Sequence, residues 1–147
     1  MNAKALRQQN ELIFVDLPKI AAMKILVVDD ELDVQTLFQQ KFRKEIKEGE
    51  FDFAFASSGE AALAYMTDHH QEAVLILSDI NMPGMSGLQL LAKIKKEYAT
   101  PPPVVMMITA YGDAENHRQA TELGADDFLT KPVDFISLKE KLKHIVA

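Results

Sequence analysis

Residues 74–87 read VLILSDINMPGMSG, a short apolar run that ends on an aspartate. A continuous apolar run of this length is typical of a strand in a parallel sheet that is covered on both faces. The proline and glycines at 83, 84 and 87 indicate a turn into the next element. A carboxylate at the end of a buried strand costs free energy unless a partner offsets its charge. The segment therefore predicts a strand that ends at a polar site, with Asp79 at its centre.

The same organisation recurs along the chain and predicts the fold class. Further apolar runs lie at 24–28, 104–108 and 127–130, and the alternating segment 51–56 (FDFAFA) suits a strand nearer a sheet edge. Apolar residues at spacings of three and four predict helices over 34–46, 88–98 and 138–145. The order is a (βα)5 repeat. It predicts an α/β fold, a doubly wound five-stranded parallel sheet with helices on both faces.

Local signals mark the ends of several helices. Ser57 and Glu60 have the S-x-x-E spacing of a capping box. The other expected caps are Asp113 and Asp134 at helix starts, and Gly49 and Gly124 at helix ends.

Size and charge restrict the function. The chain has 147 residues, the size of one domain, and a net charge of −6. This charge argues against broad nucleic-acid binding and against docking on anionic lipid. The chain has no cysteine, which excludes disulfides, thiolate zinc sites and a cysteine nucleophile and fits a reducing cytosol. We therefore expect a cytoplasmic protein with no direct nucleic-acid or membrane partner.

The N-terminal segment falls outside the repeat. Residues 1–22 contain one apolar patch at 12–15, which Asp16 and Pro18 interrupt, so they do not form a signal peptide or a membrane span. We divide the chain into an N-terminal extension or linker, 1–22, and a domain, 23–147.

Polar side chains follow four of the five predicted strands at their carboxyl ends. Asp29 and Asp30 follow the first strand, Asp79 the third, Thr109 the fourth and Lys131 the fifth. Ligands of open parallel sheets bind at this edge. Three clustered carboxylates repel one another, and a hard divalent cation such as Mg²⁺ relieves the repulsion. With a lysine and a hydroxyl alongside, Asp79 is a candidate nucleophile for phosphoryl transfer.

Four motifs carry a resemblance to a known family. They are ILVVDDE at 25–31, LSDINMPGMSG at 77–87, ITAYGD at 108–113 and GADDFLTKPVD at 124–134. Together they resemble the receiver domain of two-component response regulators, over residues 23–147. The resemblance implies a flavodoxin-like sheet of strand order 2-1-3-4-5.

The resemblance also implies residue roles. Asp79 would accept the phosphoryl group, and the Mg²⁺ site would comprise Asp30 as a direct ligand, Asp29 through a water, Asp79 itself and the backbone carbonyl of Asn81. Thr109 and Lys131 would contact the phosphoryl oxygens. Phe128 would be the aromatic switch residue, acting with Thr109. The small Ala110 would leave room for the phosphoryl donor, and Lys131–Pro132 is a candidate cis peptide.

The function implied is a signalling switch and not an enzyme with its own substrate. A histidine kinase or histidine phosphotransfer protein would phosphorylate Asp79. The face formed by the fourth helix, fifth strand and fifth helix (the α4-β5-α5 face in the family's own count) would then change. That face would control an output domain or partner, or form a homodimer.

Two alternative functions and the roles of three modulating residues remain open. A haloacid-dehalogenase-type phosphatase also uses an Asp nucleophile and Mg²⁺, but it needs a second Asp where this chain has Asn81. A pseudo-receiver would act as a plain interaction module, but it usually lacks part of the acidic set or the lysine. Tyr111, two residues after Thr109, is expected to shield the phosphoryl group from water, and Asn81 and Ala110 to modulate the same step.

Overall fold

A five-stranded parallel sheet forms the centre of the computed structural model, which describes residues 2–8, 11–17, 22–72 and 74–146. Its strands are β3 (Met23–Val28), β4 (Phe51–Ala56), β5 (Leu75–Asp79), β6 (Val105–Thr109) and β7 (Asp127–Thr130). They lie in the order β4-β3-β5-β6-β7, so the expected order 2-1-3-4-5 is confirmed. The alternating segment FDFAFA is the edge strand β4, as its pattern indicates.

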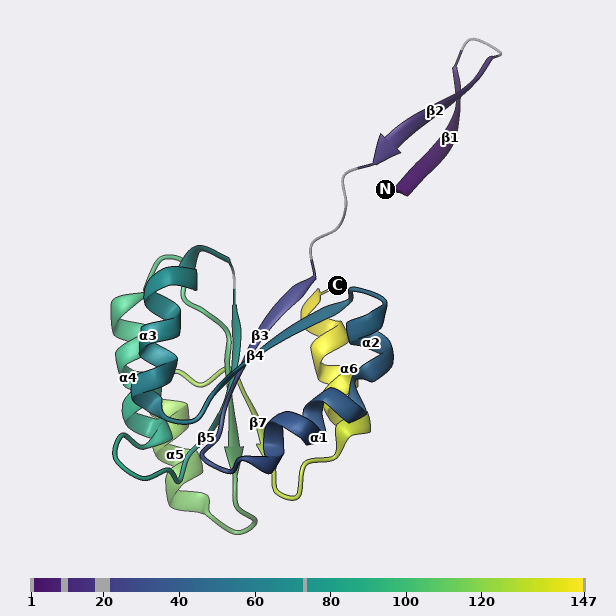
Figure 1. The fold of residues 1–147 in the computed structure, drawn as a ribbon. Coiled ribbons are helices and arrows are strands. Elements are labelled where there is room, and N and C mark those ends of the chain that lie inside the picture. The colour runs from purple at the N-terminus through teal and green to yellow at the C-terminus, as the bar shows by residue number, and fades with distance from the viewer. Residues whose placement is uncertain (1, 9–10, 18–21, 73, 147) are drawn as a thin grey trace.

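Helices cover both faces of the sheet (Figure 1). One layer holds α3 (Gly59–His69), α4 (Gly87–Glu97) and α5 (Ala114–Glu122), and the other holds α1 (Asp33–Lys41), α2 (Arg43–Lys47) and α6 (Phe135–Val146). The short 3-10 helix η1 (His70–Glu72) follows α3. Alternate residues of β3 serve the two layers: Leu26 and Val28 pack toward α3, α4 and α5, and Ile25 and Val27 toward α1 and α6. No helix in the described ranges combines the length and apolar character that crossing a membrane requires.

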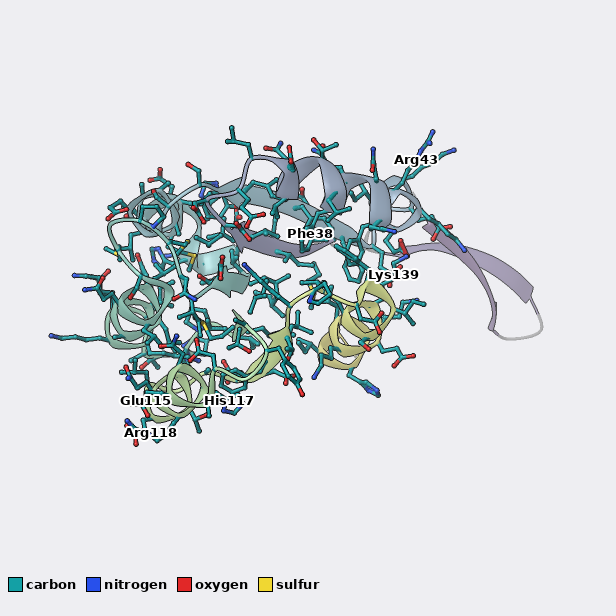
Figure 2. All side chains as sticks on the ribbon, turned by 90° about the horizontal axis from the view of Figure 1, so that it is seen from below. Phe38, Arg43, Glu115, His117, Arg118 and Lys139 are labelled. Atoms are coloured by element: carbon teal, nitrogen blue, oxygen red, sulfur yellow. The ribbon has the colours of Figure 1, made fainter. Side chains whose placement is uncertain are left out.

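The first predicted helix, 34–46, is broken into two at Phe42. The backbone there leaves helical geometry, with φ −107° and ψ 19°. The Phe42 side chain is fully buried, and its ring lies 5.0 Å from that of Phe53 and 5.9 Å from that of Phe38. Figure 2 labels Phe38 on the side of α1 that faces α6. The break coincides with this buried aromatic cluster, and helical periodicity alone does not predict it.

Most of the expected helix ends are confirmed, and one is wrong. Ser58 rather than Ser57 caps α3, because its Oγ accepts the Ala61 N–H at 3.0 Å. Glu60 does not close a capping box with Ser57 but accepts the Met85 N–H at 3.1 Å, across the loop after β5. The confirmed ends are the N-caps Asp113 and Asp134, and the left-handed glycines Gly49 and Gly124, with φ of +74° and +98°.

The N-terminal segment contains a hairpin that the sequence did not predict. β1 (Asn2–Gln8) and β2 (Glu11–Leu17) pair antiparallel, from Asn2 opposite Leu17 to Gln8 opposite Glu11. They form a two-stranded sheet of their own and do not extend the five-stranded one (Figure 1). The division into residues 1–22 and 23–147 stays a prediction.

Glu45 of α2 is a buried carboxylate that forms an ion pair with Lys139 of α6. Its side chain is 8% exposed, and its Oε2 lies 3.3 Å from the Lys139 Nζ. Its Oε1 has no hydrogen-bond partner among the described residues. Lys139 also lies 5.4 Å from the centre of the Phe42 ring. This ammonium therefore offsets a buried charge and joins two helices of one layer.

The Lys139→Met substitution should lower the free energy of unfolding by about 1–3 kcal/mol, because the buried Glu45 carboxylate then lacks its ion-pair partner. Chemical denaturation of the wild type and the variant measures the loss. The double variant Glu45→Leu with Lys139→Met should recover most of it, because no buried charge remains. Equal stability of Lys139→Met and wild type would contradict this interpretation of the pair.

Candidate functional site

Three carboxylates meet at the carboxyl edge of the sheet. Asp79 is the last residue of β5 and only 4% exposed, whereas Asp29, directly after β3, is half-buried and Asp30 is exposed. β5 pairs with β3, so these strand ends are neighbours. One carboxylate oxygen from each of the three lies within 4.8 Å of the others. The structure therefore brings together the three aspartates that the sequence singled out.

Lys131 pairs directly with Asp79. Its Nζ donates to Asp79 Oδ2 at 2.8 Å, and its backbone N–H donates to the Thr109 carbonyl at 2.8 Å. Burial alone would lower the pKa of Lys131, but the hydrogen bond and charge of Asp79 more than offset it, so the pKa is raised. Lys131 thus stays charged beside the buried carboxylate.

Asp29 is held less favourably in its charged form. Burial, and secondarily the negative charge of Asp79, raise the pKa of Asp29, although the Glu31 N–H donates to its Oδ1 at 2.9 Å. A single lysine therefore does not neutralise the cluster. The three aspartates therefore leave an excess of negative charge at the carboxyl edge of the sheet, which is open to solvent at Asp30.

Thr109 and the two residues after it lie at the end of β6, next to the end of β5 that carries Asp79. Thr109, at the end of β6, is 6% exposed, and its Oγ1 donates to the Leu129 carbonyl at 3.4 Å. Ala110 and Tyr111 are exposed, Tyr111 by 91%, and both line an apolar cavity of about 510 Å³ that also borders Asp29 and Lys131. Tyr111 therefore lies beside the site but does not cover it in this conformation.

Phe128 and Asn81 occupy the remaining predicted positions. Phe128 of β7 is half-buried against the core on the α3–α5 side of the sheet. Asn81 is exposed, and its N–H donates to Asp79 Oδ1 at 3.4 Å. Asp79 Oδ1 thus has a weaker partner than Oδ2. The Lys131–Pro132 peptide is cis, as expected.

The loop after Asp79 is anchored at its far end by two features that the sequence analysis missed. Ser86 and Gln89 form a capping box at the start of α4, a signal present in the sequence as S-x-x-Q. Gly87 packs against the strand end, because a Cβ there would lie 2.1 Å from the Asp79 carbonyl oxygen. Glycine is required at position 87 because the helix backbone lies so close to the backbone of the strand end. This close contact cannot be predicted from any pattern in a single sequence.

The donor set fits a hard divalent cation. Asp29, Asp30 and Asp79 supply only oxygen atoms, in a cluster that carries excess negative charge and is open to solvent on the Asp30 side. Mg²⁺ takes oxygen ligands, uses few carboxylates and keeps several waters. The residues present are therefore suited to hold Mg²⁺.

Comparison with known proteins agrees with this arrangement. The sequence model of the response regulator receiver domain matches residues 25–143. The chain belongs to this family. Receiver domains are signalling domains of two-component systems, and they bind Mg²⁺ at an acidic pocket of this kind.

Curated relatives share the receiver domain but are longer. The chain is 32% identical over 123 residues to the response regulator RppA of Synechocystis, covering 84% of this chain and 50% of that protein. It is 33% identical over 122 residues to a cyclic di-GMP phosphodiesterase of Thermotoga maritima, covering 83% of this chain and 30% of that protein. The receiver chain therefore spans half or less of these two relatives.

Solved structures share the fold over the same region. The receiver domain of NtrX from Brucella abortus is similar with a TM-score of 0.69 and 32% identity, over 82% of this chain and 95% of that one. A response regulator receiver protein from Pseudomonas putida gives 0.72 and 28%, over 86% and 99%. Both comparisons confirm the flavodoxin-like receiver fold.

Gly87→Ala should destabilise the receiver domain by about 1–3 kcal/mol, because the new methyl group overlaps backbone that cannot yield. Gly59→Ala is the matched control, since Gly59 also directly follows a serine N-cap, Ser58, but the three atoms nearest to its added Cβ all belong to the Met85 side chain and none to the backbone. Denaturant unfolding of both variants checks this. A Gly59→Ala loss as large as that of Gly87→Ala would contradict the assignment of a backbone clash.

Proposed function

We propose that this receiver domain is a phosphorylation-dependent switch whose phosphoacceptor is Asp79. The observation that carries the proposal is the 2.8 Å pair between Lys131 Nζ and Asp79 Oδ2 beside Asp29 and Asp30. A buried carboxylate held between an ammonium and two further carboxylates is arranged as an activated nucleophile and not as a helix cap.

The chemistry follows from the residues around Asp79. A carboxylate oxygen of Asp79 attacks the phosphorus of a phosphohistidine, the P–N bond breaks, and its electron pair leaves with the imidazole, which then takes a proton. Lys131 and the Thr109 hydroxyl stabilise the charge on the phosphoryl oxygens. Bound Mg²⁺, held by Asp29, Asp30, Asp79 and the Asn81 carbonyl, would supply further positive charge. Ala110 leaves room for the donor.

Phosphorylation would be read out through Thr109 and Phe128. In the structure Thr109 Oγ1 is bound to the Leu129 carbonyl, next to Phe128 on β7. Drawn toward a phosphoryl group, the hydroxyl leaves this position and gives the Phe128 ring space to move inward. The face of α5, β7 and α6 would change with it.

The proposed partners follow from this readout. A histidine kinase or histidine phosphotransfer protein supplies the phosphoryl group. A downstream domain or protein, or a second copy of this chain, binds the altered face of α5, β7 and α6. Each acts only through its different affinity for the two states. The two relatives named above extend well beyond the matched receiver region, which supports an output domain as one such partner.

Incubation with acetyl phosphate and Mg²⁺ tests the proposal. We expect a mass increase of one phosphate that is absent in Asp79→Asn and lost on omission of Mg²⁺, measured by intact-protein mass spectrometry. Asp126→Asn is a control, because Asp126 is an exposed carboxylate paired with Lys95 away from the cluster. Phosphorylation of Asp79→Asn to the wild-type level would show that another residue is the acceptor.

Tyr111→Ala should speed loss of the phosphoryl group several-fold, because the ring can fold from its exposed position over the edge of the site and exclude water. The decay of phosphorylated protein after removal of acetyl phosphate measures the rate. Tyr111→Phe should decay like the wild type, since it keeps the ring. An unchanged rate in Tyr111→Ala would rule out shielding by this residue.

A further inference from the structure

His117 of α5 lies flat against the aromatic ring of Phe128. The two ring centroids are 3.7 Å apart, and the planes differ by 24°. His117 is exposed, whereas Phe128 is half-buried. Figure 2 labels His117 beside α5, with Glu115 and Arg118 on the same helix. The histidine thus covers a ring of the predicted switch residue that would otherwise be more open to solvent.

The surroundings hold both partners of this stack in place. Asp113 caps α5 by accepting the Asn116 N–H, and Arg118 pairs with Glu115 and Glu122, so the turn that carries His117 is well held. The Phe128 N–H donates to Asp127, whose carboxylate pairs with Lys141 at 2.8 Å. These hydrogen bonds and ion pairs therefore connect the segments on both sides of the stack to their neighbours.

We propose that His117 is a positioning residue that stabilises the orientation in which the half-buried Phe128 ring stacks on it, and so disfavours the switched state of the unphosphorylated domain. This inference rests on the switch role proposed for Phe128. Aromatic contacts of this kind shift an equilibrium by about 2- to 10-fold. When the binding-competent state is a small minority of the molecules, a shift of this size appears nearly in full in the apparent affinity for a ligand of that state.

Binding of beryllofluoride, a mimic of a carboxylate-bound phosphoryl group, tests the proposal in the presence of Mg²⁺. We expect His117→Ala to bind it about 2- to 10-fold more tightly than the wild type, by isothermal titration calorimetry. His117→Phe should bind like the wild type, because it keeps a flat ring against Phe128. In a Phe128→Ala background, His117→Ala should have no further effect.

His69→Ala is the matched control. His69 stacks on Tyr65 in α3, with centroids 3.9 Å apart and planes 7° apart, away from the switch. Replacing His69 by alanine removes a comparable aromatic stack, so both alanine variants should have a slightly lower melting temperature. Only His117→Ala should change the affinity for beryllofluoride. This separates positioning of Phe128 from general loss of stability.

Three results would overturn the proposal. They are an unchanged or weaker affinity in His117→Ala, an equal gain in His69→Ala, and an equal gain in His117→Phe, each with normal binding by the wild type. Absence of binding by the wild type itself would overturn the proposed function along with this inference. The two failures are therefore distinguishable.

Discussion

The pair between Lys131 and Asp79 is the interaction around which the rest of the site is arranged. A carboxylate that is 4% exposed needs a compensating charge, and the Lys131 ammonium at 2.8 Å provides one. The lysine reaches it because the backbone after β7 is tied to the end of β6 through the Thr109 carbonyl. The same hydrogen bond joins the ends of β6 and β7, so that Thr109 and Lys131 come from neighbouring strand ends at the carboxyl edge of the sheet.

The parallel sheet explains why these residues meet although they lie far apart in the sequence. All five strands end at one edge, and β5 is central, with β3 and β6 as its neighbours. Asp29, Asp79 and Thr109 therefore come from adjacent strand ends without any special loop. The two helix layers bury both faces of these strands, so these polar groups reach solvent at the carboxyl edge of the sheet. Gly87 completes the arrangement by letting α4 start against the Asp79 carbonyl.

Much of the fold and of the candidate site could be predicted from sequence, for definable physical reasons. Apolar runs of strand length such as 74–77 indicate burial on two faces, and helical spacing such as that of 88–98 indicates burial on one. Their alternation predicts a parallel sheet with helices on both faces, whereas the strand order was predicted from the resemblance to the receiver family. The site aspartates and Lys131 were found because the carboxyl ends of parallel strands share an edge. The break at Phe42, the partner of Glu60 and the stack of His117 on Phe128 were not found, since each depends on which side chain fills a particular space in three dimensions. The hairpin of β1 and β2 was missed because residues 1–22 lack clear strand periodicity.

In the proposed switch, Asp79 carries the phosphoryl group as an acyl phosphate. Borohydride reduction of protein treated with acetyl phosphate and Mg²⁺ converts such an aspartyl phosphate to homoserine, and peptide mass spectrometry locates the converted residue. We expect homoserine at position 79 and unmodified aspartate at 29 and 30. Conversion at Asp29 or Asp30, with Asp79 unmodified, would contradict it.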